Sequence, residues 1–456
     1  MRGEFAVGLF ILASAAVATA QDTCLTGASE LGDRRVLTTL RAAIDAACPC
    51  PPAGVATARR QYARCVRMQI RAAFAADTLR SECVGTALDI YRSATCDTNR
   101  VPCGSPPAAA GEAATCRRAA PSGHDACSGA DENACSALTH CNDVVDATVG
   151  TCIDPRQPGP YGVGVRTLHL TKDSVASPGT ERVLDTIVWY PIAAGSGPID
   201  NRLKGVVDAP LDNSGGPYPL LMFSHGSCGY PYQSTFLTPL LASYGLIVAA
   251  PPHPGNQIFD LPNCNTGAAI IASSMERPAD IIFVTDHMLA ETADTASPFF
   301  GAIDTQRIGM SGHSFGGYTT YVVATQDPRY RIAVPLAPAV PPNQSTLTVP
   351  SLTMMSELDT FVNNPAIDTA YGKGSAPKMK VEVEHAGHFA YSDGCFPSPD
   401  CNPPTTLTQD EAHALVQRFV VPFVLRYLKD DMRFEPFLEA APPPGVLVTS
   451  QGIPGE

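Results

Sequence analysis

The pattern of hydrophobic and polar positions changes near residue 158 of the chain. Before it, apolar residues recur at spacings of three and four over Val36–Ala47 and Ala56–Arg92, which predicts two or three short helices. After it, short apolar runs alternate with helical stretches. The predicted strands are Val183–Tyr190, Leu220–Ser224, Leu246–Ala250, Arg307–Ser311, Ile332–Leu336, Ser351–Ser356 and Lys380–Glu384, and the predicted helices are Thr235–Tyr244, Pro278–Ala293, Phe315–Gln326 and Gln409–Leu428.

Strands that alternate with helices in this way form a largely parallel sheet with helices on both faces. In such sheets, ligands bind at the carboxyl ends of the strands. The second part of the chain is therefore predicted to be an α/β domain whose functional residues lie in loops that follow strands.

The cysteines are concentrated in the first part of the chain. Twelve of the 16 lie between Cys24 and Cys152, and the four later ones are Cys228, Cys264, Cys395 and Cys401. Such a number favours disulfides formed in an oxidising compartment. No cysteine spacing fits a zinc knuckle, and the acidic residues near Cys127 match no EF-hand loop, so disulfides are favoured over metal binding.

The N-terminus predicts export. An apolar run from Phe5 to Val17 follows Arg2, and Ala18-Thr19-Ala20 fits a signal-peptidase site, so the mature chain is expected to begin at Gln21. The run is shorter than the ~20 residues that span a bilayer. The predicted location is secreted or periplasmic, with no integral membrane segment once the signal is removed.

Shifts of composition predict five segments. Residues 1–20 are predicted to be a signal peptide, 21–101 a cysteine-rich helical region, 102–126 a linker rich in Pro, Ala and Gly, 127–155 a small disulfide module, and 156–456 the α/β domain. Because every candidate catalytic residue lies after residue 220, the segments before about residue 155 are expected to be dispensable for chemistry, the alternative being a lid over the pocket. The sequence indicates no partner for them.

The charge of the chain limits its partners. Lys and Arg total 31 against 44 Asp and Glu, which gives a net charge of −13, and only 16% of the residues are charged. Such a chain offers no basic surface to nucleic acid or to an anionic membrane.

The strongest chemical signal is the segment Gly312-His313-Ser314-Phe315-Gly316-Gly317. It follows a predicted strand and opens a predicted helix, which is the context of a nucleophile elbow. A side chain at position 312 or 316 would collide with the neighbouring strand or helix, and Ser314 would point out of the sheet while the amino end of the helix faces a developing oxyanion. We predict that Ser314 is a catalytic nucleophile.

A serine nucleophile of this type needs a base, which comes last in the chain order Ser, Asp or Glu, His. His385 ends an alternating strand, whereas His388 follows Ala386-Gly387 and can lie on a loop above the sheet. His388 is therefore the predicted base, and His385 is a structural residue near the site. His413 lies inside the last predicted helix and is expected on the surface.

The predicted acid is Asp359, which follows the strand Ser351–Met355 and lies deeper in its loop than Glu357 does. Glu357, Asp327 and Asp368 remain alternatives.

Two backbone amides are predicted to bind the oxyanion, those of Phe315 and Ser227. Ser227 lies in the turn after the strand Leu220–Phe223, where His225 is expected to pack rather than act as a second base. His313 and Tyr230 are candidates for substrate binding. No metal or organic cofactor is implied.

Six segments between about Gly159 and Leu438 together resemble the α/β-hydrolase superfamily, in the branch of platelet-activating-factor-acetylhydrolase-like enzymes, dienelactone hydrolases and cutinase-like bacterial polyester hydrolases. They are Phe223–Gly226, Ala249–Asn256, Arg277–Asp280, Gly312–Gly317, Ala386–Phe389 and Arg426–Asp431.

Two departures from these relatives matter. In the eukaryotic acetylhydrolases the acid follows the strand after the nucleophile, but that strand ends here in Leu336-Ala337-Pro338, so Asp359 matches the bacterial branch. Polyester hydrolases often carry an aromatic residue where Ser227 stands, although Tyr230 and Tyr232 are nearby in this chain.

The resemblance implies an α/β-hydrolase fold and a carboxylic-ester hydrolase that forms an acyl-enzyme on Ser314, without a cofactor. Its substrate is a lipid, a polyester or a small ester, so a cutinase-like polyester hydrolase and a phospholipid acetylhydrolase both remain open. Other classes are a peptidase or dehalogenase on this scaffold and an inactive hydrolase that serves as an extracellular binding protein. Ser314 counts against a dehalogenase, which normally uses Asp, and the complete set of candidate residues counts against a binding protein.

The four later cysteines are predicted to form two bridges. Cys395 and Cys401 flank a short segment just after His388, so their bridge would brace the histidine loop. Cys228 and Cys264 would meet at the carboxyl edge of the sheet, beside the predicted oxyanion turn.

Overall fold

A computed structural model describes residues 24, 36–37, 40, 43–44, 47–48, 56–92, 101–105, 115–119, 133–134, 154–193, 195–343, 345–395, 406–439, 442–443 and 445–453. The predicted signal peptide, most of the predicted linker and disulfide module, and Cys401 lie outside these residues. The chain forms two compact units, one built mainly of residues 1–102 and the other mainly of residues 143–456. Within the described ranges, no helix is both long enough and apolar enough to cross a membrane.

The first unit contains two helices, each of which carries a disulfide to an earlier segment of the chain. These are α2 (Ala56–Ala75) and α3 (Ser81–Arg92), so the helical prediction for this region is confirmed. Buried residues of both helices, such as Ile70 and Ala87, form one apolar cluster. The bridges Cys24–Cys83 and Cys48–Cys65 hold this small cluster together.

Three short strands follow in the chain: β1 (Val101–Ser105), β2 (Thr115–Ala119) and β3 (Asn133–Ala134). They form a sheet of their own in the order β2-β1-β3. Two of these strands lie in the stretch predicted as a linker. The Pro, Ala and Gly content of that stretch conceals them, because it lacks the apolar alternation that indicates strands.

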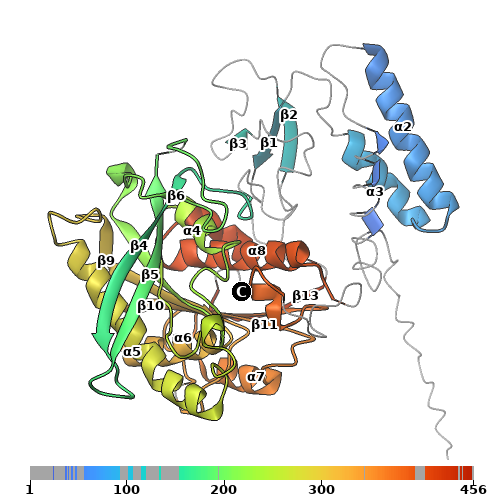
Figure 1. Cartoon of the computed structure of the whole chain (residues 1–456). Coiled ribbons are helices and arrows are strands. Elements are labelled where there is room, and N and C mark those ends of the chain that lie inside the picture. The colour runs from blue at the N-terminus through green and yellow to red at the C-terminus, as the bar shows by residue number, and fades with distance from the viewer. Residues whose placement is uncertain are drawn as a thin grey trace, which may run out of the picture. The chain divides into compact units, whose positions relative to one another are not determined.

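The second unit is built on a ten-stranded sheet in the order β13-β12-β11-β10-β9-β7-β8-β5-β4-β6 (Figure 1). The six strands from β12 to β8 in this order are parallel, and β13 and β5 flank them in antiparallel pairing. The strands are β4 (Gly162–Asp173), β5 (Glu181–Ile192), β6 (Val206–Val207), β7 (Tyr218–Ser224), β8 (Ile247–Ala250), β9 (Ile303–His313), β10 (Tyr330–Leu336), β11 (Ser351–Ser356), β12 (Lys378–Val383) and β13 (Val446–Gln451). The predicted mostly parallel sheet is thus confirmed.

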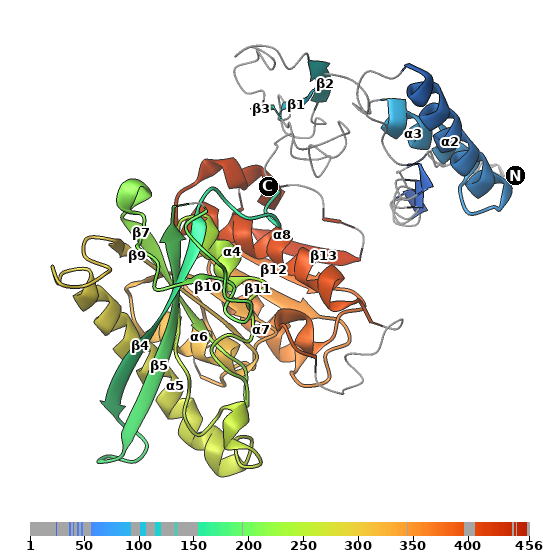
Figure 2. The same cartoon turned by 45° about the horizontal axis from the view of Figure 1, so that its top comes forward.

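Helices cover both faces of this sheet (Figures 1 and 2). On one face lie α4 (Thr238–Ser243), α8 (Gln409–Tyr427) and α9 (Glu435–Glu439), and on the other α5 (Gly267–Glu291), α6 (Phe315–Gln326) and α7 (Asn364–Lys373). Strand residues alternate between the two cores: Leu221 and Phe223 face α4 and α8, whereas Leu220 and Met222 pack with residues of α5. Burial on both sides explains why the central strands read as continuous apolar runs.

The domain has elements that the sequence did not predict, among them β6, α7 and α9. The flanking strands β4 and β13 alternate buried and exposed positions and lack the apolar run of a central strand, so they were not predicted. Helix α5 begins at Gly267 rather than at Pro278, which lies inside it. Its true start is capped by Thr266, whose side chain accepts a hydrogen bond from the amide of Ala269.

Candidate active site

Ser314 occupies a sharp turn between β9 and α6. Its backbone has φ +59° and ψ −114°, a region that non-glycine residues rarely adopt. Two close approaches require glycine: a Cβ at Gly316 would lie 1.8 Å from the carbonyl oxygen of Ser224, and a Cβ at Gly312 would lie 2.4 Å from that of Gly316. The expected collisions at positions 312 and 316 are therefore confirmed.

His388 and Asp359 lie in line with Ser314. His388 opens the short helix η5 (His388–Tyr391) beyond β12, and its Nε2 is 2.8 Å from Ser314 Oγ. Its Nδ1 is 2.7 Å from Oδ2 of Asp359, whose side chain is 0% exposed. The amides of Phe361 and Val362 donate to Oδ1 of Asp359 at 2.8 and 3.1 Å, so they fix the carboxylate that orients the imidazole.

His313 packs beneath this arrangement. Its Nε2 donates to the backbone oxygen of His388 at 2.9 Å, and its Nδ1 accepts from the side-chain amide of Gln233 at 3.1 Å. The ring is buried, and burial together with the neighbouring His388 lowers the pKa of His313 well below its ordinary value. Both ring nitrogens of His313 are therefore bonded within the protein. The substrate contact predicted for His313 would have to break one of these bonds.

The alternative acids lie elsewhere. Glu357 accepts a hydrogen bond from the amide of His385 at 2.8 Å. Asp327 and Asp368 pair with Arg329 and Lys380 respectively.

The other histidines also differ in their surroundings. His225 is buried in the turn after β7, as expected, where its Nδ1 donates to the carbonyl oxygen of Gly226 at 2.7 Å. His413, expected on the surface, lines a groove and is half-buried: its ring stacks on Phe236 and bonds through Nε2 to the carbonyl oxygen of Ser392.

The turn after β7 lies against the serine, because a Cβ at Gly226 would be 3.5 Å from Ser314 Cβ. Most of its amides are occupied: Gly226 donates to Gln233 Oε1 at 2.9 Å, Cys228 to the carbonyl oxygen of Asn256 at 3.1 Å, and Gly229 to that of Gly226 at 3.1 Å. The amide of Ser227 makes no hydrogen bond to any residue that the structure describes.

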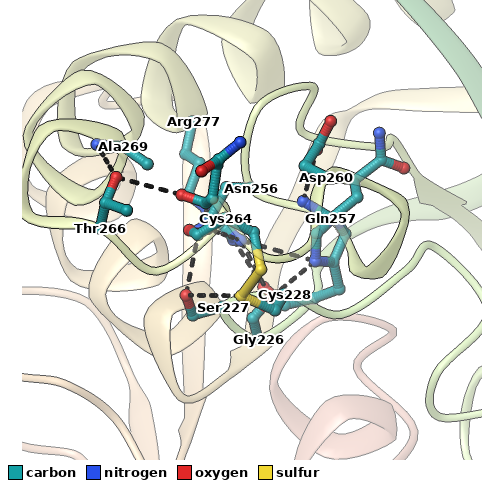
Figure 3. Close-up of a disulfide and its surroundings, with 12 residues drawn as sticks. Gly226, Ser227, Cys228, Asn256, Gln257, Asp260, Cys264, Thr266, Ala269 and Arg277 are labelled. Atoms are coloured by element: carbon teal, nitrogen blue, oxygen red, sulfur yellow. Dashed lines mark hydrogen bonds between the residues drawn. A yellow bond between two sulfur atoms is a disulfide. The ribbon is translucent and has the colours of Figure 1, made fainter.

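The predicted bridge Cys228–Cys264 is present and ties this turn to the loop between β8 and α5 (Figure 3). Cys395 is also disulfide-bonded, but the predicted bridge to Cys401 stays a prediction because Cys401 lies outside the described residues. Sequence reasoning missed two residues beside the first bridge, Asn256 and Arg277. Both lie in segments that carry the family resemblance, which was their only signal.

One exposed aromatic side chain lies against the imidazole of His388. The ring of Phe361, which is 59% exposed, stacks on the imidazole of His388 with centroids 4.9 Å apart. Tyr230, a predicted substrate contact, packs against Tyr232 at 4.5 Å, and both line a groove of about 510 Å³ whose lining does not include Ser314, His388 or Asp359. Among the described residues, no group of three or more His, Cys, Asp or Glu side chains is arranged to hold a metal ion.

The order of strands and the turn that carries Ser314 define the class of this protein, an α/β-hydrolase. The family model described as PET hydrolase-like matches residues 205–451, which is 247 of the 456 residues, and the chain belongs to this family.

Three proteins of similar sequence are a lipase, a terephthalate hydrolase and a cutinase. The chain is 28% identical over 289 residues to Lipase 1 of Moraxella sp. (strain TA144), covering 60% of this chain and 80% of that protein. It is 24% identical over 274 residues to a bis(hydroxyethyl) terephthalate hydrolase of Streptomyces coelicolor, covering 59% and 74%. It is 26% identical over 247 residues to cutinase est1 of Thermobifida alba, covering 53% and 71%. The protein is a carboxylic-ester hydrolase of the cutinase-like kind.

Proposed function

We propose that Ser314, His388 and Asp359 are the catalytic triad of this ester hydrolase. The observation that carries the proposal is the unbroken line of hydrogen bonds, 2.8 Å from Ser314 Oγ to His388 Nε2 and 2.7 Å from His388 Nδ1 to Asp359 Oδ2. Such a line lets one imidazole take a proton from the serine while the carboxylate stabilises the resulting imidazolium.

The reaction proceeds in two halves. Ser314 Oγ attacks the ester carbonyl carbon as His388 removes its proton, and collapse of the tetrahedral intermediate breaks the bond to the alcohol, which leaves with the proton from His388. Water then attacks the acyl-enzyme with His388 again as base, and the carboxylic acid departs. In both halves the amides of Ser227 and Phe315 stabilise the oxyanion.

The substrate class follows from the open side of the site. The exposed ring of Phe361 against His388 supplies an apolar wall, which suits an apolar acyl group or an aromatic one. The named relatives are a lipase, a terephthalate ester hydrolase and a cutinase, and their range agrees with a hydrolase of lipid-like or polyester substrates.

We also propose that the enzyme acts outside the cytoplasm. Three disulfides join described residues, at Cys24–Cys83, Cys48–Cys65 and Cys228–Cys264. Bridges of this number persist in oxidising compartments. They support secretion or a periplasmic location, with the signal peptide predicted for residues 1–20.

Turnover of p-nitrophenyl butyrate by the Ser314→Ala variant tests the proposal. Loss of the nucleophile removes a factor on the order of a million in triad enzymes. The exposed Ser196 provides a matched control, because its hydroxyl bonds only to the carbonyl oxygen of Ala193 among the described residues, and Ser196→Ala is expected to keep full activity. Ser314→Ala with more than about a tenth of the parent turnover would contradict the assignment. A panel of p-nitrophenyl esters, a phospholipid and a polyester film then ranks the substrate classes.

A further inference from the structure

Arg277 of α5 is a fully buried cation with an unusual set of partners. It donates to the carbonyl oxygens of His225 at 2.5 Å and Gly226 at 3.0 Å, and to Oδ1 of Asn256 at 3.0 Å from Nε and 2.6 Å from Nη2. A longer bond of 3.3 Å reaches Oγ of Ser224. All of these acceptors are neutral, and within the described part of the chain no carboxylate forms an ion pair with Arg277.

Stability alone does not explain this placement. A buried charge is costly unless an opposite charge pairs with it. Burial lowers the pKa of Arg277 to about 9, which still leaves the side chain charged at neutral pH. The carboxylate of Asp280 acts on Arg277 through its charge alone, and its oxygens are paired with Arg182 and Lys172.

The contacts of Arg277 fix the direction of one peptide group. The carbonyl of Gly226 points at the guanidinium, and in a planar trans peptide the following N–H points the opposite way. The amide of Ser227 is therefore directed away from Arg277. Asn256, held by Arg277 through Oδ1, donates from Nδ2 to Ser227 Oγ at 3.0 Å and so fixes the same residue from its side chain (Figure 3).

The same guanidinium reaches the second oxyanion donor. Its central carbon lies 4.8 Å from the centroid of the Phe315 ring, a cation-π contact that packs the first residue of α6 against Arg277. One side chain thus binds the carbonyl of the peptide group that carries the Ser227 amide and packs on the ring of Phe315, the residue of the other oxyanion donor in the proposed function.

We propose that Arg277 is a positioning residue of the oxyanion hole, which holds the Gly226–Ser227 peptide and Phe315 so that both amides converge on the reacting carbonyl. This inference rests on the proposed function. The positive charge behind the peptide also polarises it, which strengthens the Ser227 N–H as a donor when negative charge develops on the substrate.

The test is the Arg277→Lys variant, which keeps the charge but loses the planar fork that binds two carbonyl groups at once. We expect kcat on p-nitrophenyl butyrate to fall by about 100-fold with KM changed less than about threefold, because the oxyanion forms only in the transition state. The inhibition constant of a trifluoromethyl ketone, whose adduct with Ser314 carries the oxyanion, is expected to rise by the same factor.

Arg182→Lys is the matched control, because Arg182 is a buried arginine that binds Asp280 and does not contact the turn at residues 224–228. Its kcat and inhibition constant are expected to stay near those of the parent. Should Arg277→Lys fail to fold, Asn256→Ser gives the second measurement, since it leaves the guanidinium and removes the amide that links it to Ser227. The same parallel loss of kcat and inhibitor affinity is expected.

A folded Arg277→Lys enzyme with kcat within threefold of the parent would overturn the positioning role. So would a fall in kcat that the inhibition constant does not follow, or an equal fall in Arg182→Lys. If Arg277→Lys does not fold and Asn256→Ser is measured in its place, an unchanged kcat in Asn256→Ser overturns the positioning role as well. Activity retained by Ser314→Ala would instead overturn the proposed function, so the two failures are distinguishable.

Discussion

Removal of the Cys228–Cys264 bridge is expected to cost far more stability than activity. The bridge spans 36 positions of sequence, for which the loss of loop entropy from the unfolded chain corresponds to about 4 kcal/mol. For a domain of roughly 300 residues that free energy lowers the Tm by roughly 6 °C. Turnover is expected to stay within about tenfold of the parent, because Gln233, Asn256 and Arg277 continue to hold the turn.

The assay compares Cys228→Ala/Cys264→Ala with the parent in guanidinium chloride unfolding and in hydrolysis of p-nitrophenyl butyrate at 25 °C. Cys48→Ala/Cys65→Ala, which removes a bridge of the helical unit, is the matched control. It is expected to leave the unfolding transition of the α/β unit unchanged. The reasoning is refuted if the first double variant loses less than about 1 kcal/mol. It is also refuted if the variant keeps its stability and loses its turnover.

Three more predictions concern the site and its support. Asp359→Asn is expected to lower kcat by about 10⁴-fold. Glu357→Gln changes an exposed side chain paired with His385 and is expected to keep most of the parent kcat. Equal losses of kcat in the two variants would make Glu357 a candidate acid again. Burial lowers the pKa of His225, His253 and His313 well below 6.5, so the unfolded chain binds protons that the native chain does not, and stability present above pH 6.5 is lost as the pH falls. The loss of unfolding free energy approaches about 4 kcal/mol per pH unit for three protons. An equal free energy of unfolding by denaturant at pH 7.5 and at pH 5 would contradict this prediction. Gly316→Ala is expected to abolish folding of the hydrolase unit, because its Cβ meets the carbonyl oxygen of Ser224; a soluble variant with a native circular dichroism spectrum would show that the elbow can open.

The candidate triad could be predicted from sequence because each member follows the end of a strand. The run Gly312–Gly317 carries its own backbone requirements, and Asp359 and His388 each follow an apolar strand that belongs to the same parallel sheet. Parallel strands bring their carboxyl ends to one edge, so separate local signals converge there without knowledge of the packing.

The support of the oxyanion turn could not be predicted in this way. Arg277 lay outside the helix expected from Pro278 onward, and two of its acceptors are backbone carbonyls about 50 residues earlier in the chain. Such contacts have no local pattern. His313 misled for a related reason, since its position before Ser314 indicates nearness to the site but not that its ring turns inward beneath His388.

The most direct test of the central claim is to find the residue that becomes covalently modified. The enzyme is treated with a fluorophosphonate, digested and analysed by peptide mass spectrometry. The account predicts one adduct, on Ser314, together with loss of esterase activity in proportion to labelling, and no adduct in Ser314→Ala. An adduct on another residue that accompanies the loss of activity, or full activity in the unlabelled Ser314→Ala variant, would contradict it.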